Sequence, residues 1–308
     1  MARAIQYEMI RSELEEVVGE KYISTKDSDR LVYATDWFWV PQMWLDRGEE
    51  PAKPEYIVHP ESAEEVSEIV KVANAYKIPV IPYGGGSGSQ GGALSIFGGI
   101  IMDMKRMDKI IDIDEKSLTV TAEAGIIGTH LEWALNQKGF TLMHYAASSN
   151  CATLGGYLAP RGSGTISTKY GKAEAMLLSM QLVLPTGEII RTQIVPTHSG
   201  GLDYFRIFLG SEGTLGTITE ATMQIEYLPE VRRMRAVLFD DLSSALEAGR
   251  LIMTKRYEPM VIRLYDPAST ASRIKAILGY ELEGAYMVMG FDGDPDIAAL
   301  QEEKSMKV

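Results

Sequence analysis

Residues 84–91 read Gly-Gly-Gly-Ser-Gly-Ser-Gln-Gly, so five of these eight positions are glycine. Glycine loses more conformational freedom on folding than any other residue, at a cost of about 0.5–1 kcal/mol relative to alanine in regular structure. A run this dense is typical either of a flexible linker or of a loop whose backbone lies directly against something else. The choice between the two constrains the fold more than any other feature of the chain.

The surrounding sequence favours the ordered loop. Residues 54–83 predict a strand, a helix and a second strand, and the helix begins with Ser62 followed three positions later by Glu65, which is a capping box. The glycine run follows the second strand directly and precedes another apolar strand, at residues 98–104. Linkers do not usually lie between two buried strands, so the pattern indicates a loop at the end of a βαβ unit.

Such a loop suits an anion. Consecutive glycines let backbone N–H groups point inward as a nest, which binds negative charge without a basic side chain. The hydroxyls of Ser87 and Ser89 add further donors. The Rossmann pattern fails because its third glycine position is Ser89, and the Walker A pattern fails because no Gly-Lys-Ser/Thr follows. A non-Rossmann site for a dinucleotide or nucleotide diphosphate and a tight structural turn both stay open.

Two further stretches combine glycine with hydroxyl-bearing and other small residues. They are residues 146–171 and residues 209–219, the latter reading LGSEGTLGTIT. Three such regions in one domain suggest a long ligand that is held along its length, and FAD has that shape.

Composition restricts the class of partner. The chain of 308 residues is long enough for about two domains. Its net charge of −12 argues against a nucleic acid or an anionic membrane, although a local basic pocket for a phosphate stays compatible with it. Cys151 is the one cysteine, so no intrachain disulfide forms and the predicted compartment is cytoplasmic. No segment reaches the roughly 18 apolar residues of a membrane span, and no spacing indicates a metal site.

Periodicity predicts three parts. Residues 1–53 would hold an amphipathic helix at 5–19 followed by a loop-like aromatic arm, which is either a surface arm or a wall of a ligand pocket. Residues 54–230 would form the ligand-binding domain. From residue 231 strands and helices alternate again, and this pattern indicates the start of a second domain.

Taken together, residues 54–228 resemble the FAD-binding domain of the vanillyl-alcohol oxidase and p-cresol methylhydroxylase type of flavoprotein. The segment LGSEGTLGTIT is the most specific match, and PYGGGSGS at 82–89 and ATLGGYLAPRGSGTISTKYG at 152–171 resemble two other family segments. The similarity is greatest to the glycolate oxidase subunit, D-lactate dehydrogenase and alkyldihydroxyacetone-phosphate synthase branches. The resemblance implies an α+β fold, in which two subdomains sandwich an extended FAD and residues 231–308 begin an α+β cap (substrate) domain.

The resemblance also implies which residues contact FAD. The first loop would hold the pyrophosphate, the second segment would line the flavin, and the third would lie near the adenosine or the isoalloxazine. The implied cofactor-binding residues are Tyr83, Gly84, Gly85, Gly86, Ser87, Gly88, Ser89, Ser148, Ser149, Thr153, Gly155, Gly156, Ser163, Gly164, Glu212, Gly213, Thr217 and Ile218. The hydroxyls among them could instead satisfy their own backbone, and Ile218 could be a core residue.

Non-covalent FAD is expected. Many family members attach FAD through a histidine in the first loop, where this chain has Ser87, and none of its four histidines, His59, His130, His144 and His198, lies in that loop. Cys151 precedes a segment similar to one that carries a cysteinyl link in some members, but we expect a buried free thiol there.

The catalytic residues are not identified by the sequence, and two candidates stand out. Tyr145 could act as an acid or base or hydrogen-bond a substrate, or it could simply pack. Arg263 could bind a substrate carboxylate or phosphate, or it could pair with Asp266 or another acid. Arg161 and Lys169 are alternative partners for an anion.

The predicted function is that of an FAD-dependent oxidoreductase. It would transfer a hydride from a small 2-hydroxy acid such as lactate or glycolate to flavin N5, and electrons would pass on to a protein, a quinone or oxygen. Alternatives are a flavin transferase like alkyl-glycerone-phosphate synthase, and a non-catalytic FAD-binding subunit of a larger complex. The helical pattern at 295–308 stops without a terminating glycine. We therefore expect the rest of the cap, with any catalytic base or metal motif, to lie beyond residue 308 or on a second subunit.

Overall fold

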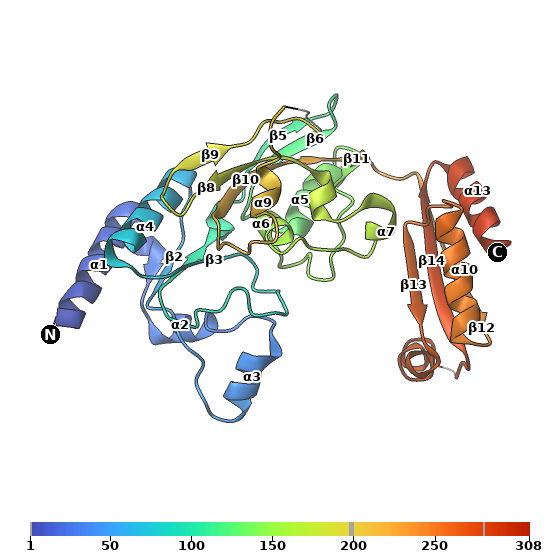
Figure 1. The fold of residues 1–308 in the computed structure, drawn as a ribbon, viewed down its shortest axis with the longest axis horizontal. Coiled ribbons are helices and arrows are strands. Elements are labelled where there is room, and N and C mark those ends of the chain that lie inside the picture. Colours follow the sequence, from blue (N-terminus) through green and yellow to red (C-terminus); the bar gives the residue numbers. More distant parts are fainter. Residues whose placement is uncertain (1, 197–199, 280) are drawn as a thin grey trace. The chain divides into compact units, whose positions relative to one another are not determined.

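The computed structural model describes residues 2–196, 200–279 and 281–308, and the chain forms two compact units (Figure 1). Unit 1 consists of Met1–Lys138, Ala146–Gly162 and Ala173–Ile225, and unit 2 of Gly139–Tyr145, Ser163–Lys172 and Glu226–Val308. The second glycine-rich region is therefore divided between the two units. The predicted division of the chain at residues 53 and 230 stays a prediction.

The first sheet of unit 1 carries the glycine loop. Its four strands follow the order β1-β2-β4-β3: β1 Ile23–Ser24, β2 Tyr56–Val58, β4 Ile100–Asp103 and β3 Val80–Tyr83. Strands β2 and β3 each pair in parallel with β4, so the predicted βαβ unit is confirmed. The carboxyl ends of these three strands lie at one edge of the sheet, which is where ligands bind in open parallel sheets.

Helix α4 (Ala63–Tyr76) connects β2 to β3 and joins two parts of unit 1. Its first turn is closed by Ser62, whose Oγ accepts a hydrogen bond from the Glu65 N–H at 3.1 Å. One face packs on α1 (Ala2–Val18) and the first sheet, in a core that includes the fully buried Leu14 and Ile69. Each such side chain contributes about 1.5–3 kcal/mol through burial. The Asn74 side chain donates to the Pro185 carbonyl at 2.6 Å and so joins α4 to the second sheet.

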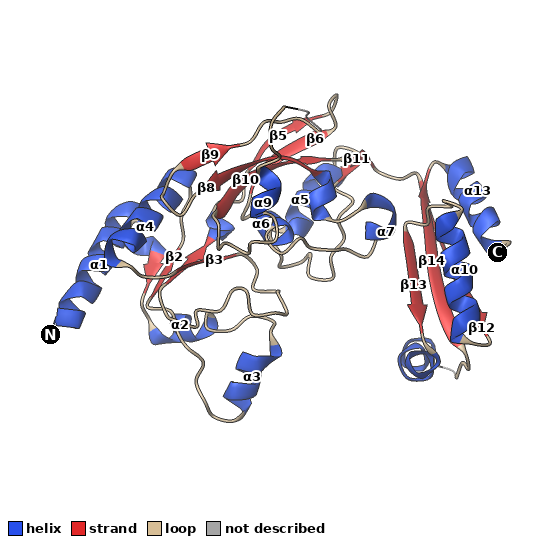
Figure 2. Ribbon diagram, viewed as in Figure 1, coloured by secondary structure: helices blue, strands red, loops and turns tan. Residues whose placement is uncertain are grey.

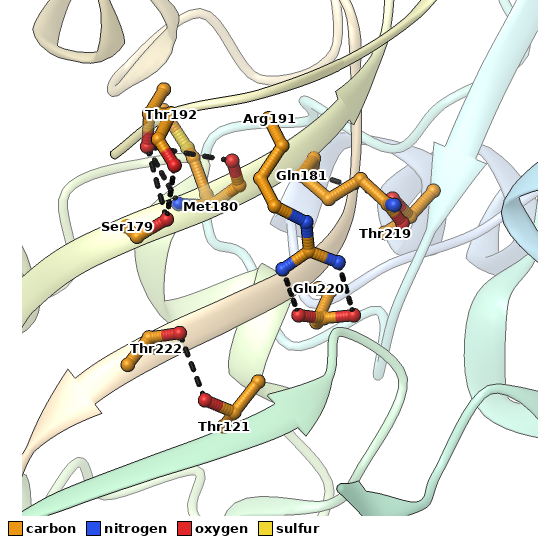
Figure 3. A network of polar contacts seen from close by, with 9 residues as sticks. All are labelled: Thr121, Ser179, Met180, Gln181, Arg191, Thr192, Thr219, Glu220 and Thr222. Carbon is orange, nitrogen blue, oxygen red and sulfur yellow. Dashed lines mark hydrogen bonds and ion pairs between the residues drawn. The ribbon is translucent and has the colours of Figure 1, made fainter. Parts of the chain in front are cut away.

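The second sheet of unit 1 is antiparallel, in the order β5-β6-β10-β8-β9. Its strands are β5 Ile110–Asp114, β6 Thr119–Glu123, β10 Thr217–Gln224, β8 Leu177–Val183 and β9 Ile189–Arg191. Figure 3 shows polar contacts across it, including Thr121 Oγ1 to Thr222 Oγ1 at 2.9 Å and Arg191 Nη2 to Glu220 Oε2 at 2.7 Å. Buried polar side chains in this sheet are therefore hydrogen-bonded, which offsets the cost of their desolvation.

The remaining described elements of unit 1 are short. They are η1 Glu20–Tyr22, α2 Asp27–Val32, α3 Trp39–Asp46, η2 Met104–Arg106, α5 Gly128–Asn136, α6 Leu154–Leu158, α8 Ala173–Met176 and α9 Phe205–Phe208. None of the helices that the structure describes is long and apolar enough to cross a membrane.

The loop-like interpretation of the aromatic arm was wrong, because the arm contains α2 and α3. Pro41 occupies the third position of α3. A proline is tolerated in the first turn of a helix, where its missing N–H would have had no partner within the helix. The arm is nevertheless exposed at its tip, where the Trp37 side chain is 78% accessible.

Unit 2 is built on a three-stranded antiparallel sheet, one face of which packs against the helices Leu242–Thr254 and Pro295–Met306 (Figure 2). The strands follow the order β12-β14-β13: β12 Val231–Phe239, β14 Ala285–Gly293 and β13 Val261–Tyr265. Its helices are α7 Ser167–Tyr170, α10 Leu242–Thr254, α11 Pro267–Ser269, the π-helical η3 Thr270–Ile274, α12 Lys275–Leu278 and α13 Pro295–Met306. A two-stranded ribbon pairs β7 Phe140–Thr141 with β11 Glu226–Tyr227. Met287, Met289 and Phe291 of β14 point into its core.

A buried carboxylate fastens the glycine-rich segment of unit 2 to this sheet. Asp292, on β14, is fully buried, and its Oδ1 accepts from Lys169 Nζ at 2.9 Å and from the Tyr170 hydroxyl at 2.7 Å. Burial and the bond to Asp292 raise the pKa of Tyr170, so the hydroxyl stays protonated and donates. The segment 163–172 is thereby held against β14.

We expect Asp292→Ala to lower the free energy of unfolding by about 3 kcal/mol or more, because it leaves the half-buried Lys169 ammonium without its counter-charge. Urea denaturation followed by far-UV circular dichroism measures this loss. Asp240→Ala, at an exposed position next to the same sheet, is the matched control. Equal midpoints for the two variants would contradict the assigned role of Asp292.

Candidate functional site

The glycine loop lies directly against the main chain of the second glycine-rich segment. A Cβ at Gly84 would lie 2.6 Å from Thr153 Oγ1, and a Cβ at Gly85 would overlap the Cys151 carbonyl oxygen and lie 3.0 Å from the Ala152 nitrogen. Real Cβ atoms do not approach other atoms so closely, so glycine is required at Gly85 for steric reasons. The two segments therefore meet backbone to backbone.

The third glycine-rich segment reaches the same loop. A Cβ on Gly213, whose φ is +86°, would lie 2.9 Å from Pro82 Cδ, and a Cβ on Gly92 would overlap the Glu212 carboxylate. Glu212 has a φ of +49°, a left-handed conformation that is uncommon for a residue with a side chain. The parts of all three segments that belong to unit 1 thus come together at the carboxyl edge of the first sheet.

The backbone donors of the loop are free, and two of its carbonyls hold it to the rest of the protein. Within the described chain, no backbone N–H from Gly85 to Gln90 donates a hydrogen bond. By contrast, the Gly84 carbonyl accepts from Lys105 Nζ at 2.9 Å and the Gly86 carbonyl accepts from the Trp37 N–H at 2.9 Å. A run of consecutive backbone N–H groups without acceptors among the described residues fits an anionic ligand. This arrangement favours a diphosphate site over a purely structural turn.

Two of the predicted hydroxyls of the second segment, those of Ser149 and Thr153, are engaged in local backbone bonds. Ser149 Oγ donates to the Ala146 carbonyl at 2.7 Å, and Thr153 Oγ1 accepts from the Gly156 N–H at 3.1 Å as the N-cap of α6. The Ser148 carbonyl accepts from the Ala152 N–H at 2.7 Å. These bonds shape the segment, and each residue's contact with a ligand stays a proposal.

Thr217 and Ile218 lie at the start of β10 and are both buried. They pair with Val183 and Leu182 of β8. The side chain of Ile218 belongs to the hydrophobic core, which was the alternative to a contact with FAD. Glu212 and Gly213 instead lie in the turn that precedes the strand, next to the glycine loop.

Unit 2 brings Ser163 and Gly164 close to the candidate Tyr145. A Cβ on Gly164 would lie 2.8 Å from the Tyr145 carbonyl oxygen, and the neighbouring Thr165 N–H donates to that oxygen at 2.7 Å. The Tyr145 side chain is 60% accessible, so it does not pack into the core. The preceding residue, His144, is buried, and desolvation lowers its pKa to about 4.

Arg263 lies on β13 and is exposed, with its guanidinium carbon 5.4 Å from the centre of the Tyr265 ring. It forms no ion pair with any residue that the structure describes, so the alternative pairing with Asp266 is not present. Asp266 instead accepts from the Ser269 N–H at 2.6 Å as the N-cap of α11. The Arg263 guanidinium therefore keeps its donors for another group.

The two alternative anion partners are already paired. Arg161 Nε lies 3.2 Å from Glu174 Oε1, and Lys169 is held by Asp292. The predicted burial of Cys151 was wrong, since the residue is exposed. The backbone of Cys151 packs against Gly85, whereas its side chain points to the surface. The thiol donates a hydrogen bond to the Ser148 carbonyl at 3.3 Å.

One cluster was missed by the sequence reasoning. Asp103, at the carboxyl end of β4, is 1% accessible and accepts hydrogen bonds from the Tyr33 hydroxyl and from Lys105 Nζ. His59 Nδ1 lies 3.7 Å from the same carboxylate, and burial lowers the pKa of this histidine. The sequence feature that could have revealed this cluster is Asp103 itself, an acidic residue at the end of an otherwise apolar strand. The glycine loop begins at the same edge of the sheet.

Comparison with known proteins shows which cofactor the domain binds. Residues 54–193 match the family model of the FAD binding domain. Residues 54–193 are therefore an FAD binding domain of this family. FAD is therefore the cofactor of the domain, and the free N–H groups of its first loop fit the diphosphate of that molecule.

Relatives of this FAD-binding chain include an alkyldihydroxyacetonephosphate synthase of Caenorhabditis elegans. It is 39% identical over 227 residues, which are 72% of this chain and 38% of the relative. The glycolate oxidase subunit GlcD of Bacillus subtilis is 28% identical over 289 residues, which are 90% of this chain and 60% of the relative. The chain thus spans less than two thirds of the length of either protein.

Solved structures of other proteins superpose on this chain. An alkyldihydroxyacetonephosphate synthase superposes with a TM-score of 0.86 at 28% identity, over 98% of this chain and 58% of the other. p-Cresol methylhydroxylase superposes with a TM-score of 0.76 at 17% identity, over 98% of this chain and 64% of the other, and so shares the fold. The predicted α+β fold of the p-cresol methylhydroxylase type is confirmed.

We expect Gly85→Ala to lower the free energy of unfolding of the FAD-free protein by about 1–3 kcal/mol, because the added methyl group forces two main chains apart. The same displacement should weaken FAD binding. Gly88→Ala is the matched control, since a Cβ there has no neighbour within 4 Å and the unfolding free energy should not change. Thermal unfolding of both variants, with and without FAD, checks this, and wild-type stability in Gly85→Ala would contradict it.

Proposed function

We propose that this chain is the flavin-binding part of an FAD-dependent oxidoreductase whose substrate is a small 2-hydroxy acid. The observation that carries the proposal is the loop from Gly85 to Gln90, whose backbone N–H groups have no acceptor among the described residues. An FAD diphosphate supplies acceptors of the required charge. The similarity to a glycolate oxidase subunit supports a hydroxy acid as substrate.

The residues of unit 1 that would hold FAD lie on all three segments. Gly85, Gly86, Ser87, Gly88 and Ser89 would donate backbone hydrogen bonds to the diphosphate. The segment around Thr153 and the turn at Glu212 and Gly213 would extend the site along the rest of the cofactor. The family resemblance predicts further contacts with FAD. In unit 2 they are Ser163 and Gly164, and in unit 1 they are Tyr83, Gly84, Ser148, Ser149, Gly155, Gly156, Thr217 and Ile218.

Oxidation of a 2-hydroxy acid to a 2-oxo acid removes a hydride from the hydroxyl-bearing carbon and a proton from the hydroxyl group. Bound FAD supplies the hydride acceptor, and the protein supplies binding and orientation. Arg263, which has no acidic partner among the described residues, is our candidate for binding the substrate carboxylate. The exposed Tyr145 hydroxyl is our candidate for a hydrogen bond to the substrate.

A second function is favoured by a specific observation. The relative at 39% identity is named as a synthase, and a solved synthase superposes over almost the whole chain. A flavin transferase of that kind would bring about no net oxidation. A third possibility, an FAD-binding subunit that reacts only with a partner chain, is supported by the GlcD relative, which is itself named a subunit. In the oxidoreductase that we propose first, the electron acceptor would be a protein, a quinone or oxygen.

We expect acid precipitation of the FAD-bound protein to leave all of the yellow flavin in the supernatant, because no described histidine lies in the glycine loop to form a covalent bond. Absorbance spectra of the supernatant and the redissolved pellet measure the distribution. Flavin that stays with the pellet would point to a covalent link, and the exposed Cys151 would be the first residue to replace by serine.

We expect anaerobic D-lactate or glycolate to bleach the visible absorbance band of the bound flavin, and Arg263→Met to require at least about tenfold more substrate for the same bleaching. Arg250→Met, an exposed arginine on α10 that pairs with Glu247, is the control. Stopped-flow absorbance measures both variants. A protein that binds FAD but is bleached by no hydroxy acid would contradict the substrate and favour the transferase or subunit alternatives.

A further inference from the structure

The cluster that sequence reasoning missed lies at the base of the glycine loop. Asp103 ends β4, and Lys105 follows in the 3₁₀ turn η2, at the sheet edge where β3 passes into Gly84. Because β3 and β4 are parallel and Tyr83 is in register with Asp103, the two strands deliver Gly84 and Lys105 to the same place. This position depends on the sheet, since the two residues are 21 positions apart.

The ammonium of Lys105 bridges the carboxylate and the loop. Its Nζ lies 2.7 Å from Asp103 Oδ2 and donates to the Gly84 carbonyl at 2.9 Å. The Lys105 backbone N–H donates to Asp103 Oδ1 at 3.0 Å, and the Tyr33 hydroxyl also donates to this carboxylate. Burial, then the bond to Asp103, raises the pKa of Tyr33, so this hydroxyl stays a donor. The buried carboxylate is thus satisfied on both oxygens, and its cost of burial is offset.

The surroundings fix the ammonium further. Nζ lies 5.2 Å from the centre of the Tyr83 ring and 5.9 Å from that of Tyr33, within the range of cation–π attraction. The Lys105 side chain keeps 36% of its surface accessible, whereas Asp103 keeps 1%. The pair is therefore oriented, with its negative end buried under the sheet edge and its positive end toward the loop.

When the carbonyl of a peptide group is held in place, the N–H of the next residue is held as well. The carbonyl of Gly84 and the N–H of Gly85 belong to the same planar unit, so the bond from Lys105 sets the direction of the first free donor of the loop. A loop with this much glycine has no side-chain restraint of its own and would otherwise sample many orientations. The bond from Lys105 therefore reduces the entropy that the loop loses when it binds an anion.

We infer that Lys105, held in place by Asp103 and Tyr33, is a positioning residue for the diphosphate of FAD. It orients the Gly84–Gly85 peptide. Because the C=O and N–H of a trans peptide point in opposite directions, the Gly85 N–H faces away from Lys105, on the side where the anion would be bound. The inference rests on the proposed binding of FAD by this loop, and it concerns the affinity for the cofactor, not the chemistry of the substrate.

Titration of FAD-free protein with FAD, followed by flavin fluorescence, tests the inference. Lys105→Gln should raise the dissociation constant of FAD by about tenfold, because it removes a charged hydrogen bond to the loop. Lys105→Arg keeps the charge and can still donate. It should therefore raise the dissociation constant of FAD by no more than about threefold, which is half of the tenfold change on a logarithmic scale. Lys71→Gln, an exposed lysine of the same unit that pairs with Glu68 at 2.7 Å, should bind FAD like the wild type.

The thermal unfolding temperature of each FAD-free variant separates positioning from loss of the fold. If Lys105→Gln does not fold, Tyr33→Phe carries the test, since it removes one donor to Asp103 without leaving a charge unpaired, and its dissociation constant should rise by about threefold. Wild-type FAD affinity in a folded Lys105→Gln or Tyr33→Phe variant would overturn this inference alone. A wild-type protein that binds no FAD would overturn the proposed function and this inference together.

Discussion

The structure depends on a place where two main chains meet with no side chain between them. Gly84 and Gly85 lie against Cys151, Ala152 and Thr153, and a methyl group at Gly85 would overlap a carbonyl oxygen. This contact brings the glycine loop of the first sheet against the segment that leads into α6. The backbone N–H groups from Gly85 to Gln90 have no acceptors in the described chain.

An acidic chain that binds an anionic cofactor must find local positive potential. With a net charge of −12, this protein cannot rely on its overall field. Backbone N–H groups provide partial positive charge without the solvation cost of a side-chain cation, and glycine lets them approach the ligand. Lys105 is paired with the buried Asp103, and its hydrogen bond to the Gly84 carbonyl orders the start of the loop. The arrangement confines the attraction to one edge of one sheet.

Each unit holds one buried carboxylate that fixes a glycine-rich segment. In unit 1, Asp103 holds Lys105 and through it the start of the glycine loop. In unit 2, Asp292 holds Lys169 and Tyr170 and through them the segment that contains Ser163 and Gly164. Segments without large side chains have few apolar contacts of their own, so a charged hydrogen bond from a rigid strand is an effective way to order them.

Much of this protein could be derived from local sequence. The βαβ unit followed from periodicity and the Ser62 cap, because these features depend on residues close together in the chain. The glycine run left a diphosphate site and a structural turn both open, and FAD was inferred from the three glycine-rich segments together and from their resemblance to a known family. The helix at Trp39–Asp46 was missed because a proline in a first turn looks like a helix breaker. The exposure of Cys151, the free donors of the loop and the Tyr33–Asp103–Lys105 cluster were decided only by tertiary structure. They depend on parallel strands that bring residues from distant positions to one sheet edge, and no spacing in the sequence records that approach.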